Sequence, residues 1–305
     1  MAKSQNDLGR GSVGRLLFNM ALPAIAAQLI NVLYNLVDRM YIGHIEGIGD
    51  LALTGVGVTF PVIMIISAFS MLVGMGGAPR ASMKMGAKDF DGARRILGNC
   101  ACLLVIMSVV ITAVILAFGR DFLLLFGASG NTIGYAMDYL AIYAAGTIFV
   151  QLVLGLNPFI SAQGFAKTSM LTTVIGAVLN IALDPVFIFV FGMGVKGAAL
   201  ATILSQAVSA VWVLKFLTGK RTQLKIRMKY FRLSPSVILP VVALGVSPFI
   251  MQATESIITV CFNVQLMRYG GDLAVGAMTI LSSVMQFTFL PVSYTHLTLP
   301  TICSV

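Results

Sequence analysis

Long apolar segments limit what this chain can fold into. A helix that crosses a membrane needs about 20 mostly apolar residues, because the hydrocarbon core of a bilayer is about 30 Å thick. Such segments follow one another along the 305 residues, separated by Gly, Pro or charged residues. They cover residues 16–43, 51–78, 96–118, 133–160, 168–191, 198–217, 237–267 and 273–292. Only 10% of the residues are charged, against about 25% in soluble domains. We therefore predict an all-α integral membrane protein.

Basic residues alternate between the loops that join these segments. Sixteen of the twenty Lys and Arg residues lie before the first segment or around the second, fourth and sixth loops. The densest run, Lys215–Arg232, holds no acidic residue. Because positive loops stay on the cytoplasmic side, we predict a multi-pass protein of the inner or plasma membrane with a cytoplasmic N-terminus. The high net charge then reflects topology, and we expect no nucleic-acid partner.

Two motifs after this basic run repeat motifs near the start of the chain. Ala21–Pro23 corresponds to Val246–Pro248, and Gly49–Leu53 corresponds to Gly271–Val275. We predict a six-helix bundle followed by the first two helices of a second, repeated bundle, with the substrate site between them as in many transporters. The predicted divisions are an N-terminal lobe (1–217), a basic cytoplasmic linker (218–236), a partial second lobe (237–292) and a foreign tail (293–305).

Of the acidic residues inside apolar segments, where a charge costs roughly 2.5–3.5 kcal/mol on insertion scales, three are candidates for function. They are Asp38, Asp184 and Glu255. Asn180 precedes Asp184 by four residues and therefore shares its helix face. A carboxylate beside an amide oxygen suits a hard cation such as sodium, and a buried carboxylate could carry a proton instead. We predict a cation site here.

Two neighbours extend this candidate site. Pro185 cannot donate a hydrogen bond to the carbonyl of Ile181, so a backbone oxygen is left free beside Asp184. Thr202, in the sixth segment, adds a hydroxyl. The alternative is that these polar groups only tie helices together, which is common for uncharged polar residues in membranes.

Other polar features indicate structure rather than chemistry. Arg39 and Asp138 lie near the outer ends of their segments, where a long side chain can reach the interface. Gly192–Gly197 fits the dinucleotide pattern G-x-G-x-x-G, but it follows a full apolar segment instead of a short strand. The four cysteines and two histidines show no metal-ligand spacing. We predict no enzyme activity, no metal and no organic cofactor.

Four stretches of the chain resemble the multidrug and toxic compound extrusion (MATE) family, and the resemblance extends over residues 16–292. The stretches are Tyr34–Gly43, Ala162–Lys167, Leu179–Pro185 and Phe191–Ala199. The resemblance implies twelve spans in two six-helix lobes. It also implies exchange of sodium or protons for organic cations.

The resemblance further implies roles for individual residues. Those that match the cation-binding cluster of the first lobe are Asp38, Asn180, Asp184 and Thr202. Tyr139 resembles a neighbour of that network, and Glu255 resembles an acid in the second lobe. We expect a cation-coupled antiporter that exports organic cations or drugs, surrounded by lipid and without an obligate protein partner. The alternatives are a lipid-linked oligosaccharide flippase of similar architecture, a membrane-embedded enzyme or an inactive fragment.

Overall fold

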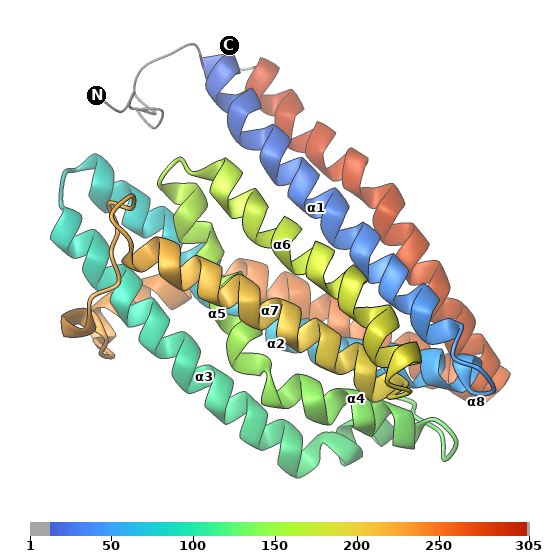
Figure 1. The fold of residues 1–305 in the computed structure, drawn as a ribbon. Helices are drawn as coiled ribbons and strands as arrows, with labels where there is room; N and C mark the ends of the chain where they lie inside the picture. The colour runs from blue at the N-terminus through green and yellow to red at the C-terminus, as the bar shows by residue number, and fades with distance from the viewer. Residues whose placement is uncertain (1–12, 304–305) are drawn as a thin grey trace.

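The computed structural model describes the backbone of residues 13–303 and the side chains of residues 22–286. The regular elements of this part of the chain are helices, and they form one bundle (Figure 1). Their bounds are α1 (Val13–Gly43), α2 (Gly49–Gly86), α3 (Phe90–Leu125), α4 (Ile133–Ala145), α5 (Thr147–Ala162), α6 (Ala166–Pro185), the π-helix η1 (Val186–Val190), α7 (Val195–Thr218), the 3-10 helix η2 (Met228–Tyr230) and α8 (Pro235–Cys303). The predicted all-α membrane fold is confirmed.

The fourth predicted segment is broken where the sequence predicted one continuous span. α4 and α5 meet at Gly146 with a bend of 59°. A Cβ atom at Gly146 would lie 2.3 Å from the side chain of Ile203 in α7. The glycine therefore lets α7 approach the break, and this tertiary contact has no counterpart in the hydrophobic pattern.

A kink inside α8 separates the last two predicted segments. Gly271 has φ 65° and ψ −163°, a backbone conformation that is almost confined to glycine. Gly49, its counterpart in the repeat, opens α2. The Thr54 hydroxyl donates to the backbone oxygens of Asp50, at 2.8 Å, and Asp272, at 3.2 Å. The two Gly-Asp motifs thus lie together, each between the first two spans of its copy.

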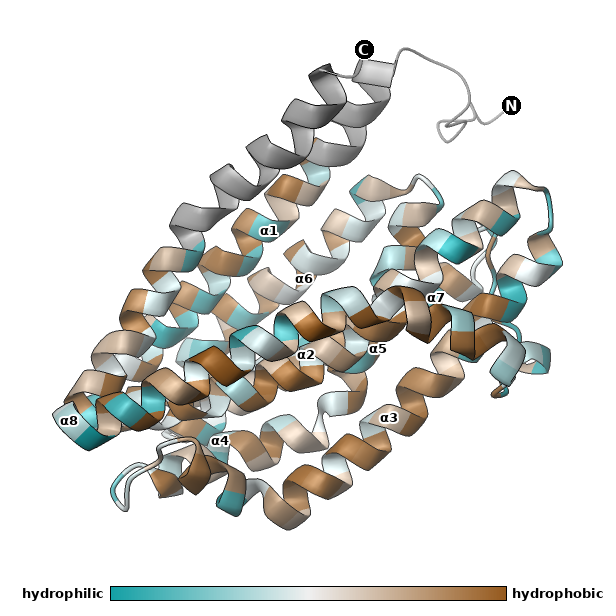
Figure 2. Cartoon of the chain, turned by 180° about the vertical axis from the view of Figure 1, so that it is seen from behind, coloured by the Kyte–Doolittle hydropathy of each residue, from teal (hydrophilic) through white to brown (hydrophobic). Residues whose placement is uncertain are grey.

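Most of the predicted spans also satisfy a length and hydropathy test. Among the described residues, five helices are long and apolar enough to cross a membrane, and the bent α4–α5 pair makes a sixth span. α8 counts once, although it holds two predicted segments. Figure 2 shows apolar residues along α3 and on most of the other helices. α1 is not among the five, and its described part carries the polar residues Gln28, Asn31, Asn35, Asp38 and Arg39.

α2 lies at the centre of the bundle and packs against α1, α3, α4, α5 and α8. Its contact with α8 leaves no room for side chains at two points. A Cβ at Gly76 would lie 2.1 Å from the Val241 oxygen, and one at Gly245 would lie 1.9 Å from the Leu72 oxygen. Small residues let membrane helices approach backbone to backbone, so these glycines set the distance between α2 and α8.

The predicted cytoplasmic loops meet at one end of the bundle. Gln163, after α5, accepts hydrogen bonds from the Thr222 hydroxyl at 2.7 Å and the Leu224 backbone at 3.1 Å. Arg95, near the start of α3, donates to the Ser234 hydroxyl at 3.1 Å. The second, fourth and sixth loops are therefore neighbours, as their shared positive charge predicts.

An acidic cap starts α3 at this end. The Asp89 carboxylate accepts a hydrogen bond from the Gly92 backbone at 2.8 Å and pairs with Lys84 at 3.0 Å. The Gly92 bond, followed by the contact with Lys84, holds the pKa of Asp89 below its usual value. The cap satisfies a helix N–H that would otherwise lack a partner.

We expect Gly245→Ala to lower the melting temperature of the purified protein, because the new methyl group must push α8 away from α2. Overpacking of this kind costs about 1–3 kcal/mol. Thermal unfolding in detergent measures the effect. Gly86→Ala is the matched control, since a Cβ at Gly86 meets nothing within 4 Å. Equal melting temperatures for the two variants would contradict the close contact.

Candidate cation site

Four helices bring five of the predicted site residues together. They are Asp38 of α1, Tyr139 of α4, Asn180 and Asp184 of α6, and Thr202 of α7. α6 packs against both α1 and α7, and α4 packs against α7. All five are buried except Thr202, which is partly buried. Residues that are far apart in sequence therefore form one polar cluster inside an apolar bundle.

Asn180 is the centre of the hydrogen bonds in this cluster. Its Nδ2 atom donates to Asp184 Oδ1 at 3.1 Å and to the Thr202 hydroxyl at 3.4 Å. The Thr202 hydroxyl donates in turn to the Ala198 carbonyl at 3.0 Å, and Tyr139 lies beside it. The predicted shared face of Asn180 and Asp184 is present. These hydrogen bonds orient the Asn180 side chain, and its Oδ1 atom has no hydrogen-bond partner in the described part of the chain.

The carboxyl groups of Asp38 and Asp184 interact directly with each other. Asp38 is 8% exposed and Asp184 is fully buried. Two negative charges in contact repel strongly where water does not screen them. A pair of this kind is stable only when a proton or a cation neutralises part of its charge.

Three oxygen atoms of the cluster are available to a cation. Asp38 Oδ1, Asn180 Oδ1 and Asp184 Oδ2 are buried and receive no hydrogen bond from any donor in the described part of the chain. Leaving a buried polar atom unpaired costs about 1–3 kcal/mol. Carboxylate and amide oxygens are ligands that hard cations prefer. The donor set therefore fits a small cation or a proton.

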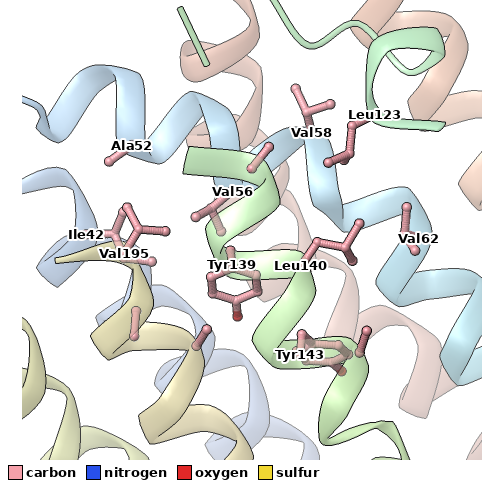
Figure 3. Close-up of a cluster of buried hydrophobic side chains, with 14 of the residues drawn as sticks. Ile42, Ala52, Val56, Val58, Val62, Leu123, Tyr139, Leu140, Tyr143 and Val195 are labelled. Carbon is pink, nitrogen blue, oxygen red and sulfur yellow. The ribbon is translucent and has the colours of Figure 1, made fainter. Parts of the chain in front are cut away.

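Two tyrosines near the cluster were not among the predicted site residues. Tyr34 interacts electrostatically with Asp38 and Asp184, and it precedes Asp38 by one helical turn. Tyr143 stacks on Tyr139 with ring centroids 6.1 Å apart, and Figure 3 shows both rings on α4 among apolar side chains. A spacing of four residues links each tyrosine to a predicted residue, so helical periodicity could have found both.

Glu255 is not part of this cluster. Its side chain is exposed on α8, and its backbone oxygen accepts a hydrogen bond from Thr259 at 2.9 Å. Asp138 pairs with Lys196 of α7 at 3.4 Å, and both side chains are exposed to solvent or lipid. The contact of Asp138 agrees with the structural role predicted for it.

Arg39 differs from its prediction, because it points into the protein instead of towards the membrane interface. Its Nη1 atom donates to the Thr279 carbonyl at 2.7 Å and to the Ser283 hydroxyl, both in α8. Its guanidinium also lies 5.0 Å from the centre of the Phe60 ring. These partners compensate a charge that would otherwise be buried alone.

The fold and the cluster define a helical membrane protein with acidic and amide groups inside its bundle. A family model described as MatE matches residues 23–186, more than half of the chain. The chain belongs to this family. It is therefore a multi-pass membrane protein from a family of transporters, not enzymes.

Curated relatives carry names that describe export. The multidrug export protein MepA of Staphylococcus haemolyticus (strain JCSC1435) is 26% identical over 276 residues, which cover 90% of this chain and 60% of that protein. MepA of Staphylococcus aureus (strain NCTC 8325 / PS 47) is 24% identical over 278 residues, covering 91% of this chain and 61% of the relative. The chain thus spans about 60% of the length of these relatives.

Solved transporter structures share the fold. The MATE multidrug transporter DinF-BH, solved as a ligand complex, aligns with a TM-score of 0.89 and 31% identity, covering 96% of this chain and 66% of that one. An outward-facing multidrug resistance MATE family transporter of the MOP superfamily aligns with a TM-score of 0.81 and 28% identity, covering 95% and 64%. The bundle therefore has the arrangement of the corresponding helices in these transporters.

We expect Asn180→Leu to lower the melting temperature, because it leaves Asp184 Oδ1 without its amide donor. The expected loss is about 1–3 kcal/mol, the cost of an unpaired buried acceptor. The double variant Asn180→Leu/Asp184→Leu removes both partners and should melt at a higher temperature than Asn180→Leu alone. Additive losses in this thermal unfolding cycle would show that the hydrogen bond does not couple the two residues.

Proposed function

We propose that this chain is part of a cation-coupled antiporter that exports organic cations or drugs, with Na⁺ or H⁺ as the coupling ion. The observation that carries the proposal is the buried pair of Asp38 and Asp184 on different helices, with unpaired oxygens around it. The names of the relatives support export of drugs. Because the chain spans about 60% of their length, the activity of the whole protein is part of the proposal.

Electrostatic repulsion supplies the exchange mechanism. When neither ligand is bound, Asp38 and Asp184 carry like charges in a buried site, and this state is unfavourable. Sodium or a proton between them compensates one of the two charges, relieves the repulsion and holds α1 against α6. An organic cation that binds the same carboxylates makes the coupling ion redundant, so each ligand favours release of the other. Alternating openings of the two lobes then turn this competition into transport.

The neutral groups of the site define its preference for ligands. Asn180 Oδ1 and the hydroxyls of Thr202 and Tyr139 offer oxygens without adding negative charge. Together with the two carboxylates, these neutral oxygens can coordinate a monovalent cation. A flippase for a pyrophosphate-linked sugar would need basic groups at this place, so the acidic cluster favours a cationic substrate.

We place the chain in the inner or plasma membrane with a cytoplasmic N-terminus. The clustering of the basic loops at one end of the bundle supports this orientation. Residues 1–217 form the first lobe of the proposed transporter, 218–236 the linker and 237–292 the start of the second lobe. The side chains of the predicted tail, 293–305, lie outside the described residues.

Asp38→Asn should abolish drug-dye efflux from cells, because one neutral amide removes the charge for which coupling ion and substrate compete. Asp138→Asn is the matched control, since the same change occurs at an acid paired with Lys196 outside the cluster. Efflux of a cationic dye at equal expression measures both variants. Imposing a sodium or a proton gradient across proteoliposomes identifies the coupling ion. Wild-type efflux by Asp38→Asn would refute the proposed site.

Single cysteines test the orientation. In a variant without its natural cysteines, Met228→Cys should react only with a thiol reagent that crosses the membrane, because Met228 lies in the linker that we place on the cytoplasmic side. Met228 is 82% exposed, so the reagent can reach it there. Lys196→Cys, at the start of α7, should react with an impermeant reagent in intact cells. The reverse labelling pattern would place the N-terminus outside.

A further inference from the structure

A small pocket lies between α1, α2 and α8, beside Arg39. Arg39 and Phe60 line it from α1 and α2, and Thr259, Asn263 and Ser282 line it from α8. It has room for a group of about the size of a water molecule. Its walls come from parts of the chain more than 200 residues apart, so it exists only where α8 packs against α1 and α2.

The pocket holds one full positive charge. The described hydrogen bonds of the Arg39 guanidinium to α8 both use Nη1, and a guanidinium has five N–H donors. Donors therefore remain for a further acceptor. None of the described residues that line the pocket is acidic. The Asp38 carboxyl, next along α1, interacts electrostatically with the guanidinium but does not line the pocket.

A second donor in the pocket lacks an acceptor. Asn263 is 4% exposed, and its Nδ2 atom has no hydrogen-bond partner in the described part of the chain. A buried amide N–H₂ group of this kind is unfavourable unless something accepts from it. The hydroxyls of Thr259 and Ser282 each donate to a carbonyl of their own helix, and neither accepts a hydrogen bond from Asn263 Nδ2.

A glycine lets α2 and α8 approach each other closely beside these donors. A Cβ atom at Gly57 of α2 would lie 2.0 Å from the Thr279 hydroxyl oxygen. Any larger residue there would separate α2 from α8 and displace Thr279, whose carbonyl holds Arg39. The position of the guanidinium therefore depends on the close approach of the two helices.

We propose that this pocket binds a small anionic group between Arg39 and Asn263. A cationic guanidinium and an unpaired amide donor complement a halide ion or one end of a carboxylate. The anion is either free chloride or the carboxylate of a zwitterionic substrate whose cationic end binds elsewhere. The second source rests on the proposed function, whereas the first does not.

Two forms of one dye test the substrate source. A cationic xanthene dye is used as its free acid and as its ethyl ester, and binding to the purified protein is followed by fluorescence polarisation in chloride-free buffer. The acid should bind about tenfold more tightly than the ester, as expected for a hydrogen-bonded charge. Asn263→Leu should reduce the affinity for the acid to that of the ester and leave the ester affinity unchanged.

The control variant makes the same chemical change outside the pocket. Gln265 lies two residues further along α8 and is exposed, so Gln265→Leu should keep the preference for the acid. If Asn263→Leu binds neither dye, Asn263→Asp replaces it, because a carboxylate there keeps the shape and repels an anion. It should also lose the preference for the acid.

Chloride tests the free-ion source. Replacing gluconate by chloride should raise the melting temperature of the wild-type protein and of Gln265→Leu, but not that of Asn263→Leu. A chloride effect without a preference for the acid assigns the pocket to the free ion. A preference for the acid that Asn263→Leu removes assigns it to the substrate.

The proposal is overturned if neither effect occurs, or if both persist in the Asn263 variants. If the wild type binds neither dye, the proposed function fails, and the chloride arm still decides the pocket.

Discussion

The contact between two buried carboxyl groups governs how α1 sits in the bundle. Asp38 and Asp184 are both buried, so water screens their mutual repulsion less than it would at the surface. α1 packs chiefly against α6, which carries Asp184. Whatever neutralises the pair therefore also decides how firmly α1 is held. A ligand that neutralises the carboxyl pair would therefore also change how tightly α1 packs against α6.

The next residue along α1 links this problem to α8. Arg39 follows Asp38 directly, yet its partners are Thr279 and Ser283, about 240 residues away. A rotation or shift of α1 that changes the carboxyl contact must also change the bonds of Arg39. α2 has no such freedom, because Gly76 and Gly245 bring its backbone against that of α8. α1 thus joins the acidic cluster to a helix whose place is fixed by α2.

The sequence could predict those structural features that depend on neighbouring residues in the chain, but not those that depend on contacts between helices. Span positions follow from the length of the apolar segments, and the shared face of Asn180 and Asp184 follows from helical periodicity. The predicted repeat pairs Gly49, which opens α2, with Gly271, where α8 is kinked. The bend at Gly146 and the inward course of Arg39 depend on contacts across the bundle, which periodicity does not record. That Asp38 belongs with Asp184 came from family resemblance, because spacing alone cannot join α1 to α6.

The two polar sites differ in which helices they require. All groups of the acidic cluster belong to α1, α4, α6 and α7, so the proposed cation site takes no ligand from α8. The pocket at Arg39 and Asn263 exists only with α8 in place. Cation affinity should therefore be insensitive to movements of α8 that leave α1 undisturbed, whereas anion affinity should change with them. Because Asp38 and Arg39 share one helix, a movement of α1 itself alters both affinities together, and this gives the protein a physical route from ligand occupancy to the contact between its halves.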